Sequence, residues 1–237
     1  MKKKMMASLL VGSAVVGASL APLSAQATTT GNTPVQVEFG GGVLPDGNGD
    51  PNTVDPDPTQ PNSNFDLLFV PREYDFGKLT ISDDLTKVIP NKADTGTNGH
   101  IESVGVGDLR GTKEGWHLTV QSDGLKLGNE ELEGYIVSGL IEEYDVVYKE
   151  EVGSYGILKP AVSVPETRPE IPVANNWKFN LGGDAVLLAN ATIGRGQGTW
   201  GFMMYSTSLK ITTPANDIKA GAYTGNVTWN LVAGPSI

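Results

Sequence analysis

Few residues in this chain of 237 could carry out chemistry. It contains two histidines, His100 and His117, and no cysteine. Zinc sites are built mainly from cysteine and histidine, and a Ser-His-Asp triad needs a positioned histidine. The composition therefore excludes thiolate nucleophiles, disulfides and iron–sulfur clusters, and it leaves almost no material for a zinc centre or a triad. We expect neither a metal nor a cofactor.

Two pairs of adjacent glutamates are the best candidates for acid–base chemistry: Glu142 with Glu143, and Glu150 with Glu151. Glycosidases use two carboxyl groups about 5–9 Å apart. Neighbouring residues of a strand point to opposite faces of the sheet, so each pair would be divided between two faces. Acidic pairs also serve as a solvated surface that discourages edge-to-edge aggregation. We therefore predict that the protein is not an enzyme.

Three charged residues are candidates for polar contacts with a ligand: Asp108, Arg110 and Arg195. Asp108 and Arg110 lie two positions apart, so an extended backbone projects both from one face. They could form an internal ion pair or contact a ligand. Arg195 belongs to the glycine-rich stretch 194–201, which formally contains GxGxxG but lacks the helix that a dinucleotide site requires. We interpret this stretch as a hairpin loop or bulge in which Arg195 is either solvated or available to a carboxylate.

The start of the chain has the pattern of an export signal. Residues 2–4 are three lysines, an apolar run covers residues 5–20, and Ala25, Gln26 and Ala27 form a small-x-small cleavage site. The pattern predicts a signal peptide over 1–27; the alternative is a membrane anchor, because the run nearly spans a bilayer. Cleavage would leave 14 basic and 27 acidic residues, a formal charge of −13, and no further membrane span. Such acidity disfavours nucleic acid as a partner, since phosphate affinity is carried by lysine and arginine.

Residues 28–64 read as an acidic linker. The part from 40 to 64 carries five prolines and four aspartates and almost nothing apolar. A segment of this kind buries too little surface to offset the entropy of ordering, which predicts an extended, solvated arm. Residues 46–50 imitate the start of a calcium-binding EF-hand loop, but proline replaces the glycine required at the sixth position. We expect no calcium site there.

Residues 65–237 predict a single all-β domain. Short runs rich in Val, Ile, Thr and aromatic residues alternate with Gly, Asn, Asp and Pro clusters, as in a β-sandwich or barrel-like fold. We expect roughly ten short, mostly antiparallel strands and one helical turn at 129–132. The predicted strands cover 65–70, 74–81, 100–107, 115–121, 134–140, 144–149, 156–164, 185–192, 199–205, 207–212 and 223–232.

Two of these strands share a Trp-x-Leu motif. The first contains Trp116 and Leu118, and the second, near the C-terminus, contains Trp229 and Leu231. Alternate residues of a strand share a face, so each tryptophan lies beside its leucine. Tryptophan and leucine on one face are typical of a sandwich core, but partly exposed tryptophans would also suit contact with a ligand. Both interpretations remain open at this point.

With these motifs the chain resembles the WxL-domain cell-surface proteins of Gram-positive bacteria. The resemblance rests on the export signal, residues 74–78 (YDFGK), residues 108–111 (DLRG), both Trp-x-Leu motifs and the ending YTGNVTWNLV. Residues 122–185 carry no matching motif. The resemblance implies a secreted protein that attaches non-covalently to cell-wall peptidoglycan and associates with exported proteins that carry WxL-interacting domains. The alternative is a subunit of an extracellular surface complex whose main ligand is another exported protein.

Overall fold

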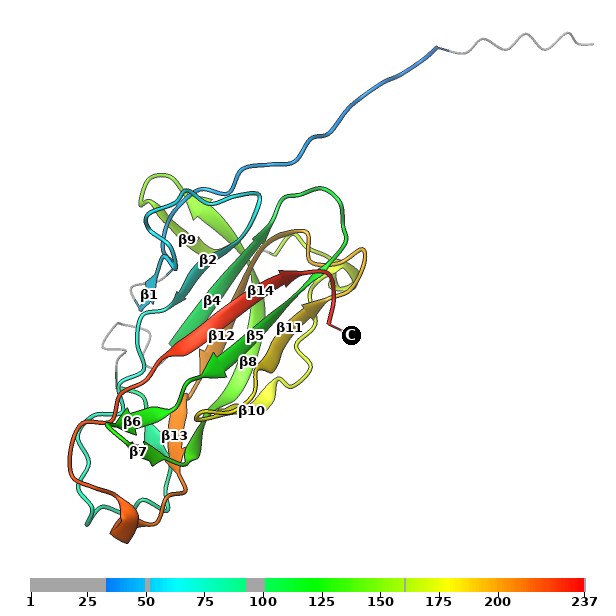
Figure 1. The fold of residues 1–237 in the computed structure, drawn as a ribbon. Coiled ribbons are helices and arrows are strands. Elements are labelled where there is room, and N and C mark those ends of the chain that lie inside the picture. Colours follow the sequence, from blue (N-terminus) through cyan, green and yellow to red (C-terminus); the bar gives the residue numbers. More distant parts are fainter. Residues whose placement is uncertain (1–32, 50–51, 93–100, 160, 237) are drawn as a thin grey trace, which may run out of the picture. The chain divides into compact units, whose positions relative to one another are not determined.

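The computed structural model describes residues 33–49, 52–92, 101–159 and 161–236 (Figure 1). The predicted signal peptide and His100 lie outside this part of the chain. The chain divides into two units, Met1–Glu38 and Phe39–Ile237. In the first unit the described residues, 33–38, are exposed and adopt no regular secondary structure. All strands described below belong to the second unit.

The second unit is built from fourteen strands and two short 3₁₀ turns among its described residues. The strands are β1 (Thr53–Val54), β2 (Phe65–Pro71), β3 (Ile89–Pro90), β4 (Ile101–Asp108), β5 (Trp116–Ser122), β6 (Leu125–Leu127), β7 (Glu130–Leu132), β8 (Gly134–Lys149), β9 (Ser154–Ile157), β10 (Asn175–Asn180), β11 (Val186–Ala191), β12 (Gly198–Tyr205), β13 (Ser208–Ile211) and β14 (Val227–Ala233). The 3₁₀ turns are η1 (Pro165–Thr167) and η2 (Ala215–Asp217).

The strands form two main sheets that share one core. The larger sheet has the order β1-β2-β4-β12-β8-β13-β3, with β9 and β10 also paired to β8, and the smaller has the order β11-β5-β14 (Figure 1). A separate two-stranded sheet joins β6 to β7. Every pairing between these strands is antiparallel. The all-β prediction is confirmed, and the larger sheet does not close into a barrel within the described ranges.

Side chains from the two sheets meet in a core rich in aromatic rings. Trp116 of β5 and Phe202 of β12 pack edge to face, with ring centroids 6.1 Å apart and planes at 80°. Along β5, Trp116, Leu118 and Val120 are buried while the alternate residues are partly exposed, which is the pattern of a strand with one face on a core. The sequence predicted this alternation. The buried side chains of β5 pack against those of the larger sheet and so hold the two layers together.

The middle of the chain differs from the sequence prediction. The two strands expected at 134–140 and 144–149 are one strand, β8, because no turn separates them and its two halves bind different partners. Strand β10 was not predicted, since its asparagines and lysine resemble a loop; its Trp177 and Phe179 nevertheless bury on alternate positions. The strand expected at 156–164 is confined to β9, Ser154–Ile157. These elements supply much of the larger sheet.

Two further local predictions are wrong. The helical turn expected at 129–132 is a β-hairpin, because Gly128 and Asn129 form the two-residue loop between β6 and β7. The segment 74–81 is not a strand. Its Asp75 amide donates instead to the Asn91 side chain (2.8 Å), while Tyr74 and Phe76 stack with centroids 6.4 Å apart. The alternating apolar side chains of this segment pack against the core, although its backbone pairs with no neighbouring strand.

The segment predicted to be a solvated linker belongs largely to the compact unit, which begins at Phe39. Leu44 is 1% exposed and packs in a second core cluster with Leu68, Phe69, Val146 and Tyr155. The Tyr155 hydroxyl donates to the Pro45 carbonyl (2.7 Å), and β1 pairs with β2. The average composition of the segment does not predict that it is ordered, because a single buried leucine and a few backbone contacts anchor it.

We predict that Leu44→Ala lowers the free energy of unfolding by about 2–5 kcal/mol, the usual cost of a cavity left by a buried leucine. Val43→Ala is the matched control, because Val43 is 80% exposed and its truncation should change stability little. Urea unfolding followed by circular dichroism measures both. Equal stability of the two variants would show that residues 43–44 form a solvated arm after all.

Candidate functional site

The two Trp-x-Leu motifs lie side by side in the smaller sheet. Strands β5 and β14 pair antiparallel with Leu118 directly opposite Leu231, and Trp229 opposite Val120. Because directly opposed residues share a face, both motifs project toward the core. The leucine pair is the midpoint of this arrangement, and the two tryptophans lie on opposite sides of it. The motifs thus form one local, approximately two-fold unit made by distant parts of the chain.

The four motif residues differ in burial. Trp116 and Leu118, on the central strand, have no exposed surface. Trp229 and Leu231, on the edge strand, are partly buried and pack against the same core cluster. The other face of β5 and β14 carries uncharged polar residues, among them Thr119 and Asn230. The first motif therefore acts inside the sandwich, and only the second reaches the surface.

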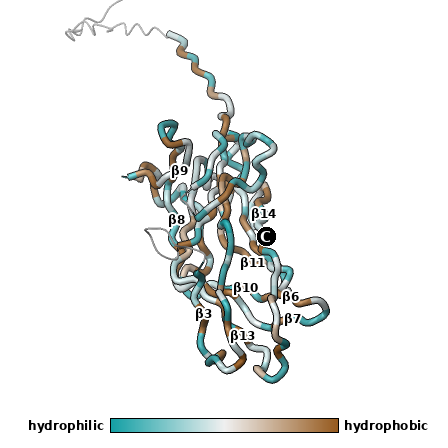
Figure 2. Tube along the Cα trace, turned by 90° about the vertical axis from the view of Figure 1, so that its left-hand side faces the viewer, coloured by the Kyte–Doolittle hydropathy of each residue, from teal (hydrophilic) through white to brown (hydrophobic). Residues whose placement is uncertain are grey.

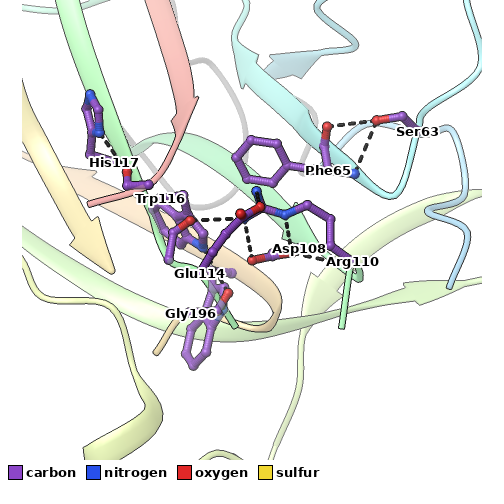
Figure 3. Close-up of polar contacts among 11 residues, drawn as sticks. Ser63, Phe65, Asp108, Arg110, Glu114, Trp116, His117 and Gly196 are labelled. Atoms are coloured by element: carbon purple, nitrogen blue, oxygen red, sulfur yellow. Dashed lines mark hydrogen bonds and ion pairs between the residues drawn. The ribbon is translucent and has the colours of Figure 1, made fainter. Parts of the chain in front are cut away.

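The Gly196 carbonyl accepts two indole N–H groups. Trp116 Nε1 of β5 and Trp200 Nε1 of β12 each donate to this oxygen at 2.9 Å (Figure 3 shows Trp116 with Gly196). Gly196 has φ +76°, and a Cβ atom there would lie 2.6 Å from Trp116 Nε1. Its own amide donates to the Thr167 carbonyl (2.8 Å). The glycine-rich stretch is thus a structural loop that lets an indole approach the backbone closely.

Asp108 and Arg110 form an internal ion pair. Arg110 Nε and Nη2 donate to the two Asp108 carboxylate oxygens, each at 2.9 Å, and Nη2 also donates to the Gly115 carbonyl at 3.0 Å. Its Nη1 pairs with Glu114, and the guanidinium lies 3.8 Å from the centre of the Phe65 ring (Figure 3). The hydrogen bond with Asp108 raises the pKa of Arg110 above its usual value. This arrangement fixes the loop before Trp116 and leaves little of Arg110 for a ligand.

Arg195 borders a surface hollow of about 590 Å³. Arg195 Nη1 lies 2.8 Å from a Glu170 carboxylate oxygen, and Arg168 Nη1 lies 3.7 Å from one of Glu143. All four side chains remain partly exposed. Prolines at 165, 169 and 172 also line the hollow and stiffen its rim. Two cations and two carboxylates therefore meet in one concave, solvent-accessible place.

Arg168 and Glu170 are not predicted from the sequence, because they lie in residues 122–185, which carry no recognisable motif. Their proximity to Arg195 is created by pairing across the fold, where Glu170 and Asn190 bond reciprocally through their backbones at 2.8 Å. No local spacing could have signalled it. The Gly196 carbonyl was also missed, although the surrounding glycines marked a place of close approach.

The two glutamate pairs have different surroundings. Glu150 and Glu151 lie in the turn that follows β8, so the prediction that a strand divides them between two faces is wrong. Glu142 accepts a hydrogen bond from the Tyr144 hydroxyl at 2.5 Å, whereas Glu143 is paired with Arg168. Adjacent positions on β8 direct them to opposite faces, as predicted. No cluster of three or more potential metal ligands occurs among the described residues, and Asp46, from the EF-hand-like stretch, accepts the Asn62 amide at 2.6 Å. No helix in that part of the chain is long and apolar enough to cross a membrane.

The fold and the paired motifs define an all-β sandwich-like domain. The sequence model of the WxL family, described as "WxL domain surface cell wall-binding", matches residues 26–235. The chain therefore belongs to the WxL family, which confirms the resemblance found in the sequence. Comparison with curated proteins and with solved structures found no match. The family is one of cell-wall-binding domains and not of enzymes.

We predict that Trp116→Ala lowers the free energy of unfolding by about 3–5 kcal/mol, because it removes a fully buried ring and one of two donors to Gly196. Trp229→Ala should cost clearly less, since its side chain is already partly solvated. Urea unfolding with a circular dichroism readout compares them. A larger loss for Trp229→Ala would contradict the assignment of Trp116 as the interior member.

Gly196→Ala should destabilise the fold more than Gly194→Ala. Both glycines have positive φ, so both substitutions carry a left-handed strain of about 1–2 kcal/mol. A Cβ atom at 194 meets nothing within 4 Å, whereas one at 196 would collide with Ala191 Cβ and lie 2.6 Å from Trp116 Nε1. The difference between the two melting temperatures isolates that collision. Equal melting temperatures would show that Gly196 is not closely packed against Ala191 and the Trp116 indole.

Proposed function

We propose that the chain is a secreted protein of a Gram-positive cell surface that attaches non-covalently to peptidoglycan. Membership of the WxL family supports wall binding, and the lysine-rich, apolar start of the sequence supports export. The protein would act as a binding module without a catalytic step. A formal charge of −13 after cleavage at residue 27 disfavours the anionic teichoic acids as its ligand, so the glycan and its stem peptides are preferred.

Family membership is the observation that carries the function, and the hollow around Arg195 is the proposed contact surface for peptidoglycan. Trp116 and Leu118 are fully buried and cannot touch a polymer without unfolding. The hollow instead offers guanidinium groups of Arg168 and Arg195 to carboxylates, and Glu170 to an amine. Stem peptides carry both kinds of group. A partly exposed ion pair contributes only about 0–1 kcal/mol, so a ligand carboxylate can replace Glu170 beside Arg195 at small cost.

Binding to peptidoglycan sacculi freed of teichoic acid tests the proposal. Co-sedimentation should be saturable for the unmodified protein, and the double substitution Arg168→Gln with Arg195→Gln should weaken it by about tenfold or more, equivalent to about 1.4 kcal/mol. Arg72→Gln is the matched control, because Arg72 is exposed and does not line the hollow, yet its loss removes the same type of charge.

The outcomes separate two parts of the proposal. Failure of the unmodified protein to sediment with sacculi would overturn direct peptidoglycan attachment. Saturable binding that survives in the double variant would retain the function but move the contact away from the hollow. Thermal melts of each variant identify any loss that results from unfolding.

The alternative function, a subunit of an extracellular complex with another exported protein, is favoured by a different observation. Strand β14 ends the smaller sheet and carries no charged side chain, so its backbone could pair with a strand of a partner such as a WxL-interacting domain. In that case sacculi alone would not retain the protein, and adding the partner would restore retention.

A further inference from the structure

Strand β14 is an unprotected sheet edge. It pairs with β5 on one side, and no other described strand bonds to it. Its sequence, VTWNLVA, contains no charge, proline or glycine. Natural proteins usually protect such edges with charges, prolines, bulges or a covering segment, because free N–H and C=O groups recruit further strands. This edge therefore has the properties of a site for strand addition.

Apolar surface borders the same edge. Trp229 and Leu231 are partly buried and pack on the core, and β14 comes close to β2, whose Phe65 and Leu67 are also only partly buried. Val232 is exposed on the outer face. A strand added along β14 would bring new side chains beside Trp229 and Leu231. Burial of apolar surface would then support the backbone hydrogen bonds.

The described N-terminal segment has the sequence pattern expected of a strand that could add to β14. Val35, Val37 and Phe39 alternate with Gln36 and Glu38, and the three apolar side chains are 92%, 73% and 89% exposed. The alternation of hydrophobic and hydrophilic residues can be followed along the extended N-terminal stretch in Figure 2. Period-two alternation is the signature of a strand with one buried face. Residues 33–47 nevertheless form no strand.

We propose that residues 35–39 of one copy add as a strand to β14 of a second copy. Every copy carries one unpaired strand pattern and one unpaired edge, so identical chains can complete one another. Five residues of strand extend about 17 Å and fit along the seven residues of β14. Val35, Val37 and Phe39 would then face the core side with Trp229 and Leu231, and Gln36 and Glu38 would lie outside.

The charge distribution favours a second copy. Two exported chains, each with a formal charge of −13 after cleavage at residue 27, repel one another unless they meet on a surface of low charge. Strand β14 has no charged residue, and residues 33–39 contribute only Glu38. Glycines at 40–42 follow the segment, and within the second unit the Gly42 amide donates to the Leu109 carbonyl at 2.9 Å. Head-to-tail association of this kind yields a closed ring when the rotation between successive copies returns to the first copy, and an open chain when it does not.

Size-exclusion chromatography with light scattering on the purified exported chain tests the proposal. The unmodified protein should form multimers whose fraction rises with concentration. Val37→Asp should abolish them, because it places a carboxylate on the buried face of the added strand. Gln36→Asp, which introduces the same charge on the outer face, should leave most of the multimer intact.

Complementation identifies the acceptor. Ala233→Asp places a carboxylate on the exposed end of β14, on the same face as Trp229 and Leu231, and should also prevent self-association. Mixing it with Val37→Asp restores one intact segment and one intact edge, so dimers of the two variants should form in the mixture while each alone stays monomeric. Both variants should melt like the unmodified protein and should still bind sacculi to the same extent, which separates this proposal from wall attachment.

Three results would overturn the proposal. The unmodified protein could remain monomeric at every accessible concentration. Its multimers could survive Val37→Asp, or disappear equally with Gln36→Asp. The mixture of Val37→Asp and Ala233→Asp could fail to assemble. A monomeric chain that captures a different exported protein through β14 would assign the edge to that partner instead.

Discussion

The two layers of the sandwich depend on one backbone oxygen. The Gly196 carbonyl accepts N–H groups from Trp116 in the smaller sheet and Trp200 in the larger sheet. A buried indole N–H without an acceptor costs about 1–3 kcal/mol, so both rings need this oxygen where it is. The loop holds it there through the positive φ of Gly196 and the bond from its amide to Thr167. A second indole repeats the device, since Trp177 of β10 donates to the Leu187 carbonyl of β11 at 3.0 Å.

The Trp-x-Leu motif, from which the family takes its name, has a structural role in this chain. The first Trp-x-Leu is interior, and the second forms the edge strand beside it, with Leu118 facing Leu231. The motif couples the C-terminal strand to the centre of the smaller sheet. The loop before Trp116 is locked in turn by the Arg110 guanidinium, which Asp108, Glu114 and Phe65 surround. Substitution of these residues would therefore reduce wall binding by destabilising the fold, and such a loss would not show that they contact a ligand.

The surfaces left for function differ in chemistry. The hollow at Arg195 is charged, with cations and carboxylates side by side, whereas the β14 edge is uncharged and partly apolar. A charged hollow suits small ionic groups on a polymer, and an uncharged edge suits another backbone. The two surfaces are built from different residues, so attachment to the wall and association between chains can occur in the same molecule.

The sequence by itself determined the all-β class, the face on which Trp116, Leu118, Trp229 and Leu231 lie, and the family, because alternation and short motifs are local properties of the chain. It also divided Glu142 from Glu143 correctly, since adjacent strand residues always face apart. Only the tertiary structure decided that β8 runs unbroken, that Leu44 anchors a polar segment, and that Leu118 meets Leu231. It alone brought Arg168 and Glu170 to Arg195 and the Gly196 carbonyl to two indoles. Strand partners, the burial of an isolated leucine and the acceptor of a distant N–H depend on contacts between residues far apart in the chain, and no local pattern encodes them.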